Sequence, residues 1–248
     1  MADVTSGCDG SRNLLLASLP PEDYAAIRPL LEIVALEPQR VLHNPGEASK
    51  YVYFPRSGFM SVAVALRDGS MVEVAPIGRE GLAGIPATGP ALSAMTNALI
   101  VVHGEDECTY RMRIDDFRRE VDKCGAFADV VNNYGEAFLA IVMQNTCCNA
   151  AHSVEQRMAK WLLMAQDRLE TPRFRITQEF LATLLGATRQ TVTGVASTLH
   201  RKHVIDYTRG RLEILDREAL EAASCECYHV STRLLQRVTA SRDTMPAR

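Results

Sequence analysis

The sequence lacks the long apolar runs of a membrane protein. No stretch approaches the roughly 20 consecutive apolar residues that span a bilayer. The N-terminus, Met1-Ala2-Asp3-Val4, has no basic segment followed by an apolar one, so we expect no signal peptide and a cytoplasmic protein without membrane contact. The seven cysteines are scattered and odd in number, which favours reduced thiols over a disulfide framework.

Catalytic and cluster-binding motifs are also missing. The sequence has no nucleophile elbow, no Walker loop and no paired-histidine cupin motif, so we predict no catalytic residues and a protein that is not an enzyme. An iron–sulfur cluster needs about four suitably placed cysteines, and the N-terminal region supplies only Cys8. The segment Cys225-x-Cys227-x-His229 offers three soft ligands without an evident fourth, so we expect no metal site there.

Charge is distributed unevenly along a chain whose formal net charge is only −3. Residues 1–151 carry 12 Lys and Arg against 19 Asp and Glu, whereas residues 152–248 carry 15 against 11. Within residues 187–211, five basic residues accompany a single acid, Asp206. A local basic patch of this kind is typical of a surface that contacts phosphates.

Two short helices across a glycine-containing turn are predicted between Ile176 and Leu199. Thr177 and Thr188 each precede a helix, where a hydroxyl can accept from an otherwise unpaired backbone N–H. Gly186 allows the left-handed conformation that ends the first helix. The arrangement is a helix-turn-helix, and the basic segment that follows disfavours the alternative of an ordinary helical hairpin in a core.

The second of these helices has two distinct faces. Its apolar face repeats at helical spacing and comprises Val192, Val195, Ala196 and Leu199. Its polar face can donate to base edges and phosphates and comprises Arg189, Gln190, Thr193 and Ser197. The runs Val204–Tyr207 and Leu212–Leu215 predict a β-hairpin with a basic tip, Thr208–Arg211. A helix-turn-helix followed by such a hairpin is a winged helix.

Short β-like runs separated by turn signals follow residue 37, whereas residues 13–35 have helical stretches. We predict strands at Arg40–His43, Tyr51–Phe54, Phe59–Leu66, Met71–Ile77, Ala98–His103 and Cys108–Arg113. Turn sequences such as Asn44-Pro45-Gly46 and Asp68-Gly69 separate them. Many short strands at this spacing indicate a jelly-roll sandwich or barrel.

Residues 115–168 are predicted to be helical. Seven positions within them alternate in steps of four and three, as in a coiled-coil seam: Phe127, Val131, Tyr134, Phe138, Ile141, Asn145 and Cys148. We favour a dimer seam over burial against the chain's own β-domain, because Asn145 at a core position can pair with its symmetry mate. Cys148 would then face its mate, either as a small buried hydrophobe or as one half of an intersubunit disulfide.

The order of roll, long helix and winged helix resembles the cyclic-AMP receptor/fumarate-nitrate regulator (CRP/FNR) family of bacterial transcription factors. The similarity covers roughly residues 15–220. It is strongest in Ile176–Leu215, where Ile-Thr-x-x-x-x-Ala-x-x-Leu-Gly-x-Thr-Arg-x-Thr-Val resembles the family's DNA-binding signature. Tyr51–Gly58 resembles a strand–turn–strand of the family's roll.

The resemblance implies an α+β fold with an N-terminal antiparallel β-roll (a jelly-roll that is cyclic-nucleotide-binding-like), a long dimerisation helix and a C-terminal winged helix-turn-helix. We assign residues 13–114 to the sensor roll and 115–151 to the dimerisation helix. Residues 152–220 form the DNA-binding domain and 221–248 a C-terminal extension.

By this resemblance the polar helix face reads bases in the major groove. Arg189 can fork onto guanine and Gln190 can bridge adenine. The family's third reading position is Gly194 here, which can read nothing, so Thr193 is left as a weak substitute. Phosphate contacts, which position a protein without specifying sequence, are predicted for Thr177, Gln178, Thr188, Ser197, Arg201, Lys202 and Arg209. We predict a homodimer on a palindromic double-stranded DNA operator, and the resemblance implies contact with RNA polymerase.

The family's cyclic-nucleotide pocket is only partly retained. The residues that correspond to it are Arg79, Glu80, Leu92 and Ser93. Leu92 stands where nucleotide-binding members have arginine, and a buried phosphate without a cationic partner loses its charge-assisted bond. We therefore expect no cyclic-AMP dependence and no cofactor. A different effector in the roll stays open, including haem at His43 or His103.

Two other functional classes fit parts of the sequence. One is a small-molecule-binding jelly-roll module whose winged helix mediates protein contacts, and the other is a jelly-roll metalloenzyme. Specific duplex binding with a steep salt dependence distinguishes a DNA-binding regulator from the first class. Metal analysis of the purified protein tests the second.

Overall fold

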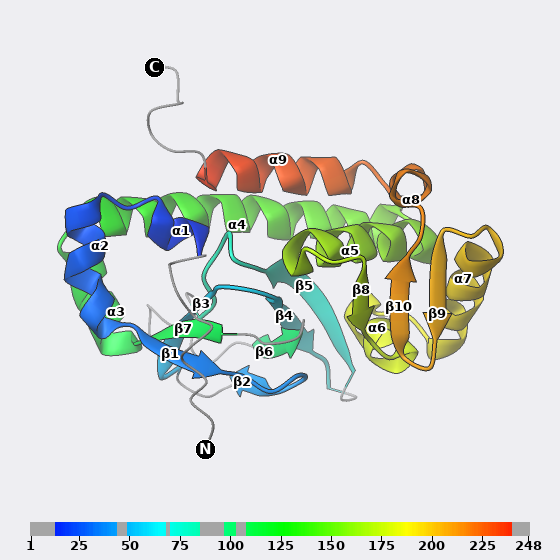
Figure 1. The fold of residues 1–248 in the computed structure, drawn as a ribbon, viewed down its shortest axis with the longest axis horizontal. Helices are drawn as coiled ribbons and strands as arrows, with labels where there is room; N and C mark the ends of the chain where they lie inside the picture. The colour runs from blue at the N-terminus through cyan, green and yellow to red at the C-terminus, as the bar shows by residue number, and fades with distance from the viewer. Residues whose placement is uncertain (1–12, 44–48, 68–69, 85–96, 103–107, 240–248) are drawn as a thin grey trace.

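The structure, a computed structural model, describes residues 13–43, 49–67, 70–84, 97–102 and 108–239, and it places a β-roll and a winged helix along one long helix (Figure 1). The N-terminal elements are α1 (Leu14–Ala17), α2 (Pro21–Ile27), the 3-10 helix η2 (Arg28–Leu30), β1 (Glu32–Ala35), β2 (Val41–His43), β3 (Tyr51–Pro55), β4 (Phe59–Ala65), β5 (Met71–Ile77), β6 (Asn97–Val102) and β7 (Cys108–Arg113). The C-terminal elements are α3 (Ile114–Asp122), α4 (Ala126–Ala151), α5 (Val154–Leu169), β8 (Arg173–Arg175), α6 (Gln178–Leu185), α7 (Arg189–Arg201), β9 (Ile205–Thr208), β10 (Arg211–Ile214), α8 (Arg217–Ala223) and α9 (Cys227–Thr239). Among these helices, none is both long and apolar enough to cross a bilayer.

The roll consists of two antiparallel sheets, with strand orders β1-β7-β3 and β2-β6-β4-β5. The predicted strands are present, and the prediction of an antiparallel roll is confirmed. Strand β1 was not predicted, because residues 13–35 have helical stretches in the sequence. Its register with β7, from Glu32 opposite Arg111 to Ala35 opposite Cys108, forms only when the distant strand is in place. Tertiary pairing therefore overrides the local preference at this position.

The helical region after the roll is divided into three helices, α3, α4 and α5. Cys124 adopts a left-handed backbone conformation with φ of 53°, and Gly125 is the N-cap of α4, so the dimerisation helix predicted for residues 115–151 is two helices, α3 and α4. α4 contains 26 residues and is about 39 Å long at 1.5 Å per residue. Ser153 caps the next helix, α5, in a capping box with Gln156.

The winged helix has its own apolar core. Helices α5, α6 and α7 pack beside the small sheet β8-β10-β9, and the core side chains include Leu162, Leu181, Leu185, Val192, Leu199 and Leu212. Phe59 of the roll belongs to the same cluster and lies with its ring centroid 5.7 Å from that of Trp161. The roll and the winged helix therefore share part of one core.

The C-terminal segment returns along the long helix. After the short helix α8, α9 packs against α4 and runs beside it (Figure 1). The side chains of Cys227 and Ser231 are fully buried in this packing. An α9 of 13 residues would be marginal alone in water, so its packing on α4 is what stabilises it.

Candidate nucleic-acid interface and neighbouring sites

Hydroxyl caps and a glycine define the helix-turn-helix. Thr177 Oγ1 accepts a hydrogen bond from the N–H of Phe180 at 3.1 Å, and Thr188 Oγ1 accepts one from the N–H of Thr191 at the same distance. Gly186 ends α6 with φ of 57°, and a Cβ there would lie 2.9 Å from Val72 of the roll. Both predicted caps and the predicted left-handed glycine are therefore confirmed.

Helix α7 presents a continuous polar face to solvent. Its buried side chains are Val192, Ala196 and Leu199, and Val195 is partly buried. Its exposed side chains include Arg189, Gln190, Thr193 and Ser197. A Cβ on Gly194 would meet nothing within 4 Å, so this position lies in open space on the exposed face.

Thr193 is engaged within the helix-turn-helix. Its hydroxyl oxygen lies 2.7 Å from Gln178 Oε1 and 2.8 Å from the carbonyl oxygen of Arg189. The single hydroxyl proton can serve only one of these acceptors at a time. Gln178 and Thr193, predicted to play different roles, are thus neighbours across the two helices.

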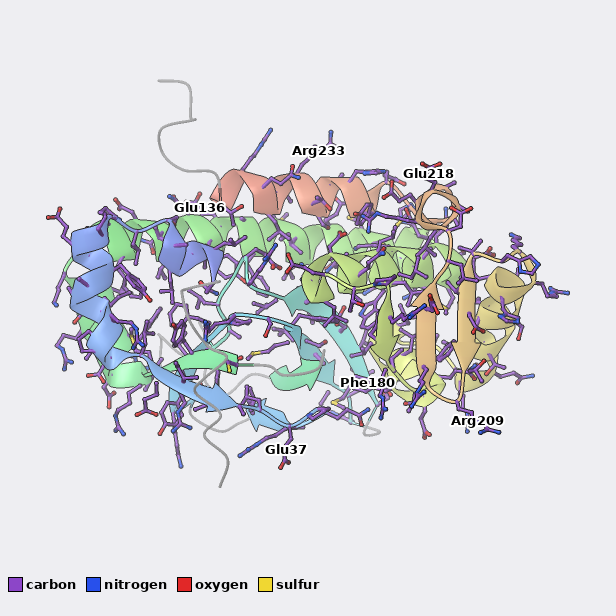
Figure 2. All side chains as sticks on the ribbon, in the orientation of Figure 1. Glu37, Glu136, Phe180, Arg209, Glu218 and Arg233 are labelled. Carbon is purple, nitrogen blue, oxygen red and sulfur yellow. The ribbon has the colours of Figure 1, made fainter. Side chains whose placement is uncertain are left out.

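The wing is a two-residue hairpin with a strongly basic edge. Arg209 and Gly210 have φ of 52° and 76°, the positive values that a type I′ turn requires at both central positions. Figure 2 shows Arg209 at the end of this hairpin. Arg211 pairs in register with Arg175 of β8, and both side chains are exposed. Like charges opposite one another are unfavourable unless an anion compensates them, so this edge is suited to a phosphate.

Arg175 was missed in the sequence because it precedes the helix-turn-helix and gains its position only through the β8–β10 pairing. Its neighbour on the same strand, Arg173, is bound instead to Glu213, with 2.8 Å between Nη2 and Oε1. Among the described residues, neither Arg175 nor Arg211 forms an ion pair. Tyr207 anchors the wing to the domain by donating from its hydroxyl to the carbonyl of Ile176 at 2.7 Å. Burial raises the pKa of Tyr207 to about 12.

Lys202 and Arg201 lie at the C-terminal end of α7, and both are exposed. Lys202 Nζ lies 3.5 Å from Glu155 Oε1, and the lysine side chain is 60% exposed. Arg201 donates to Thr198 Oγ1 at 3.3 Å. These contacts are weak and solvated, so both cations can turn toward another anion.

The charged residues of the predicted effector pocket face the winged-helix side. Glu80 Oε1 lies 2.7 Å from Arg168 Nη2 of α5, and the two side chains are only 11% and 6% exposed. Arg79 Nη2 lies 2.6 Å from Glu170 Oε1 in a more exposed pair. The other two predicted pocket residues, Leu92 and Ser93, fall outside the described residues. The turn that carries Arg79 and Glu80 is therefore bound to α5.

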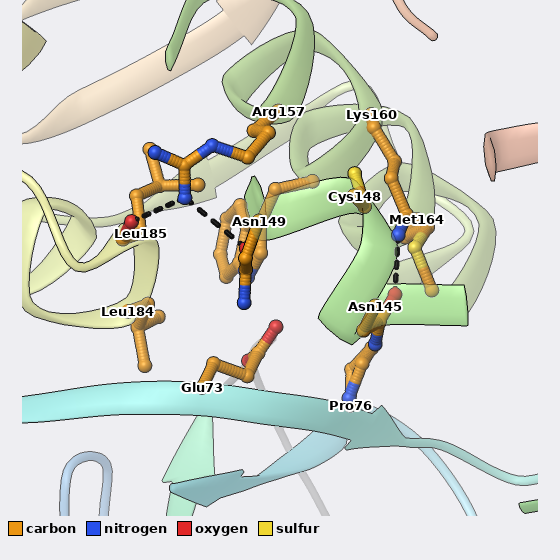
Figure 3. Close-up of a pocket in the computed structure, with 11 residues that line it drawn as sticks. Glu73, Pro76, Asn145, Cys148, Asn149, Arg157, Lys160, Met164, Leu184 and Leu185 are labelled. Carbon is orange, nitrogen blue, oxygen red and sulfur yellow. Dashed lines mark hydrogen bonds between the residues drawn. The ribbon is translucent and has the colours of Figure 1, made fainter. Parts of the chain in front are cut away.

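A pocket lined by both polar and apolar side chains lies where the roll meets the C-terminal end of α4 and the helices of the winged helix (Figure 3). Lys160 donates to Asn145 Oδ1, and Asn145 Nδ2 donates to the carbonyl of Val74 at 2.7 Å. Arg157 donates to the carbonyl of Leu185 at 2.7 Å. These bonds tie α4, α5, α6 and β5 together.

Glu73 contributes a carboxylate to this pocket. Its Oε2 accepts a hydrogen bond from the Ser61 hydroxyl at 2.6 Å. Loss of solvation raises the pKa of Glu73, an effect that the Ser61 bond and the charges of Arg168 and Lys160 oppose. The carboxyl group at this junction is therefore one whose ionisation is disfavoured by folding.

The predicted dimer seam lies inside a single chain. Phe127, Val131 and Tyr134 are buried in the core of the roll, and Phe138 packs partly buried against it. Of the remaining members, Ile141 is 2% exposed, Asn145 binds Val74 and Lys160, and Cys148 is 2% exposed. The prediction that these seven side chains form the dimer interface is wrong, because the alternating pattern records burial against the chain's own roll and C-terminal segment. Asn145 likewise forms its hydrogen bonds within the chain, and no symmetry mate is needed to satisfy its side chain.

Cys148 faces the C-terminal segment instead of a symmetry mate. Its Sγ lies 3.5 Å from Cys225 Sγ, and Cys227 Sγ lies 3.6 Å from His152 Nδ1. The prediction of a seam cysteine is therefore wrong, and Cys148 and His152 join Cys225 and Cys227 in one cluster. His229, the third residue of the predicted motif, is exposed, and its ring centroid lies 5.1 Å from that of Tyr228 in a tilted arrangement. The i, i+4 spacing of Cys148 and His152 on a helix was the signal that could have supplied the missing ligands.

Of the described cysteines, five are free thiols, as expected: Cys124, Cys147, Cys148, Cys225 and Cys227. Cys108 departs from that expectation because it is disulfide-bonded.

Comparison with known proteins agrees with this geometry. The family described as Crp-like helix-turn-helix domain matches residues 156–223. No curated protein matches the chain in sequence. Solved structures are similar over most of the chain at low sequence identity, which shows a common fold.

Three of these structures illustrate the similarity. One is described as a transcriptional regulator of the CRP/FNR family from Eubacterium rectale, with a TM-score of 0.66, 17% identity, and coverage of 84% of this chain and 96% of that one. FixK2 from Bradyrhizobium japonicum has a TM-score of 0.65 at 15% identity, covering 79% and 98%. A CRP-family transcriptional regulator from Thermus thermophilus has a TM-score of 0.63 at 18% identity, covering 79% and 99%. The chain carries a Crp-like helix-turn-helix domain and the fold of these regulators.

Proposed function

We propose that this chain, a transcriptional regulator with the Crp-like helix-turn-helix domain and the fold of the CRP/FNR family, binds a palindromic DNA operator as a cytoplasmic homodimer without requiring a cyclic nucleotide. The observation that carries the proposal is the exposed polar face of α7 beside a wing with a basic edge. Donors along a helix can enter the major groove, while cations on the wing bind the backbone. Regulation through contact with RNA polymerase is part of the same proposal.

Base reading is assigned to the first turns of α7. Arg189 has the fork geometry for guanine O6 and N7, and Gln190 can bridge adenine N6 and N7. Thr193 contributes less, because its hydroxyl is already bonded within the domain. Gly194 presents no side chain, so the operator position opposite it is free to vary. The operator is therefore read chiefly at two neighbouring base pairs in each half-site.

Phosphate binding is assigned to the residues that flank this face. Those predicted from the sequence are Thr177, Gln178, Thr188, Ser197, Arg201, Lys202 and Arg209, and the wing adds Arg175 and Arg211. The two caps use their hydroxyls within the helices, so their contribution is the orientation of backbone N–H groups at the helix N-termini. The arginines of the wing supply charge.

The proposed dimer face is the side of α4 that faces neither the roll nor α9. Exposed residues recur on it in steps of four and three: Asn132, Glu136, Leu139, Met143 and Thr146. Leu139 and Met143 are 60% and 62% exposed, which is unusual for large apolar side chains in the middle of a helix. Packing of two α4 helices by this face would bury both and set the half-sites about one helical turn, roughly 34 Å, apart.

Independence from cyclic nucleotides is supported by the pairing of the turn at residues 78–82. Glu80, which corresponds to the family's nucleotide-binding glutamate, is engaged with Arg168 in a buried ion pair. A ribose hydroxyl would have to displace that guanidinium and leave a buried charge unpaired. In addition, Leu92 replaces the arginine of nucleotide-binding members, so a bound phosphate would have no cationic partner there.

The decisive experiment is duplex binding with sites identified by genome-wide mapping. Fluorescence anisotropy on the recovered palindrome and on a scrambled duplex should give a large specificity ratio and a steep decrease in affinity with salt. A promoter reporter then gives the sign of regulation. Equal, weak binding to both duplexes would favour the alternative in which the winged helix mediates protein contacts.

A further inference from the structure

Four side chains with metal-ligating atoms converge at the C-terminal end of α4. Cys148 lies in the last turn of α4 and His152 is the C-cap of that helix, whereas Cys225 and Cys227 lie between α8 and the start of α9. Their sulfur and nitrogen atoms all lie within 4.8 Å of one another. The three cysteines are buried, and the histidine side chain is 16% exposed. Two segments about 75 residues apart in sequence thus meet through these four groups.

Two of the distances between these atoms are close to those around a tetrahedral ion, and all the atoms lie within 4.8 Å of one another. With zinc–sulfur bonds of about 2.3 Å and zinc–nitrogen bonds of about 2.0–2.1 Å, tetrahedral ligands are about 3.8 Å apart between sulfurs and about 3.5 Å apart between sulfur and nitrogen. Cys148 Sγ and Cys225 Sγ are 3.5 Å apart, and Cys227 Sγ and His152 Nδ1 are 3.6 Å apart. A disulfide would need sulfurs at about 2.05 Å, so these thiols are not bonded to each other.

Groups outside the four ligands have the arrangement found around metal sites. His152 Nε2 lies 3.3 Å from Glu226 Oε2, which fixes the ring so that Nδ1 points at the cluster. Gln144 Nε2 donates to Cys227 Sγ at 3.0 Å, so this sulfur is held by a donor from outside the cluster. Such orienting contacts are not needed by cysteines that merely fill a core.

We propose that Cys148, His152, Cys225 and Cys227 bind one zinc ion in a closed, structural site. Three thiolates and an imidazole are soft and borderline ligands, which excludes calcium and magnesium as the resident ion. All four positions are supplied by the protein, so no open position is left for a substrate or a water. The ion holds the chain together and performs no chemistry.

The site fastens the C-terminal segment to the joint between two functional parts. His152 is the residue that ends α4, immediately before α5 begins the winged-helix half. Cys227 is the first residue of α9, which lies along α4. Binding of the ion would hold α8 and α9 against α4 and fix the direction in which the chain leaves that helix. The free energy of metal binding would therefore contribute to the folding stability of this region.

Metal content of the full chain is the direct test. Protein purified from zinc-supplemented cells, with its affinity tag removed, should contain one zinc per chain by mass spectrometry, and Cys225→Ser should lose it. Two matched controls keep the ion: Cys147→Ser removes an exposed thiol next to the cluster, and His229→Ala removes the exposed histidine of the C-terminal segment. Full zinc content in Cys225→Ser would overturn the proposal, and so would iron with visible absorbance in the wild-type protein.

A second measurement guards against misfolding of the cysteine variant. Stripped wild-type protein titrated with Co²⁺ should develop the intense visible bands of a tetrahedral cobalt–thiolate centre, saturating at one ion per chain. Added Zn²⁺ should abolish those bands and raise the unfolding temperature. Failure of the stripped chain to bind either ion, with its helical circular dichroism intact, would refute the site. Both readouts are made without DNA, so their outcome is independent of the proposed function.

Discussion

Glu80 of the roll and Arg168 of α5 form a buried ion pair, with 2.7 Å between Oε1 and Nη2. The same carboxylate oxygen accepts from the N–H of Gly78 at 3.1 Å, and Arg168 Nη1 donates to the carbonyl of Met164 at 3.0 Å. A Cβ on Gly78 would lie 2.8 Å from the Arg168 side chain, so glycine is what allows this approach. The pair joins the roll to α5, the helix that packs in the core of the winged helix.

Breaking this pair from one side should be strongly destabilising. Arg168→Met leaves the carboxylate of Glu80 buried without a cation, and we expect the free energy of unfolding to fall by about 3–5 kcal/mol in urea denaturation. Arg79→Ala is the matched control, because its pair with Glu170 is exposed and should contribute less than about 1 kcal/mol. The double variant Glu80→Leu/Arg168→Met should recover most of the loss. Equal effects of Arg168→Met and Arg79→Ala would contradict this assignment.

Glu73 should make the protein less stable as its carboxyl group ionises. Since burial raises its pKa in the folded protein above the ordinary value of 4.5, the protonated form is favoured by folding. The associated stability is fully present below pH 4.5 and is lost as the pH rises through the folded pKa. Glu73→Gln has no such loss, so its stability relative to the wild type should increase across that window and then level off. Urea denaturation at a series of pH values measures this difference.

Ser61 provides the control for that pH dependence. Its hydroxyl donates to Glu73 and lowers the pKa, so Ser61→Ala should shift the window to higher pH. A stability difference between Glu73→Gln and the wild type that does not change with pH would show that Glu73 acts only through packing.

Replacing Arg189 by alanine should change DNA binding in a different way from replacing Lys202 by alanine. Arg189→Ala should lose roughly 1–3 kcal/mol on the cognate site and relax specificity at one base pair, because it removes a bidentate base contact. Lys202→Ala should weaken cognate and random DNA alike and reduce the salt slope by about one unit, because it removes a phosphate contact. Fluorescence anisotropy at several salt concentrations separates the two patterns. Identical patterns would mean that the division into reading and positioning residues is wrong.

Substitutions at two adjacent residues of α4, Phe138 and Leu139, should distinguish an effect on folding from an effect on dimerisation. Leu139→Asp places a charge on the proposed dimer face, so we expect a folded monomer by analytical ultracentrifugation and loss of tight operator binding. Phe138→Asp instead places a charge against the roll, where Phe138 packs 5.9 Å from the ring of Tyr134, and should lower stability. If Leu139→Asp remains a dimer that binds the operator, α4 does not associate through this face.

Cyclic nucleotides should leave DNA binding unchanged. Operator affinity measured with and without millimolar cyclic AMP or cyclic GMP is expected to be the same, because Glu80 and Arg79 are already paired with α5. A large gain in affinity with either nucleotide would show that these pairs open to admit it.

The sequence by itself determined those features that depend on neighbouring residues. Thr177 and Thr188 cap helices and Gly186 ends one because capping and left-handed backbone preferences act within a few residues. The turn at Arg209-Gly210 follows from the same kind of local rule. The exposed donors of α7 were identified for a related reason, since helical periodicity alone divides a helix into faces. These local features were enough to predict a DNA-binding domain.

Only the tertiary structure decided which surfaces meet. A heptad pattern on α4 indicates that one face of the helix is buried. It does not say whether that face packs against the roll, a second subunit or the C-terminal segment, because all three can be apolar. In the structure, the chain's own roll and α9 cover this face. The pairing of Arg175 with Arg211 and the strand β1 likewise depend on register between distant strands. The cysteine–histidine cluster is the clearest case, because Cys148 and His152 gain their other two ligands only when a helix returns across about 75 residues of chain to lie beside them. Such contacts are set by the packing of whole elements, which no short stretch of sequence encodes.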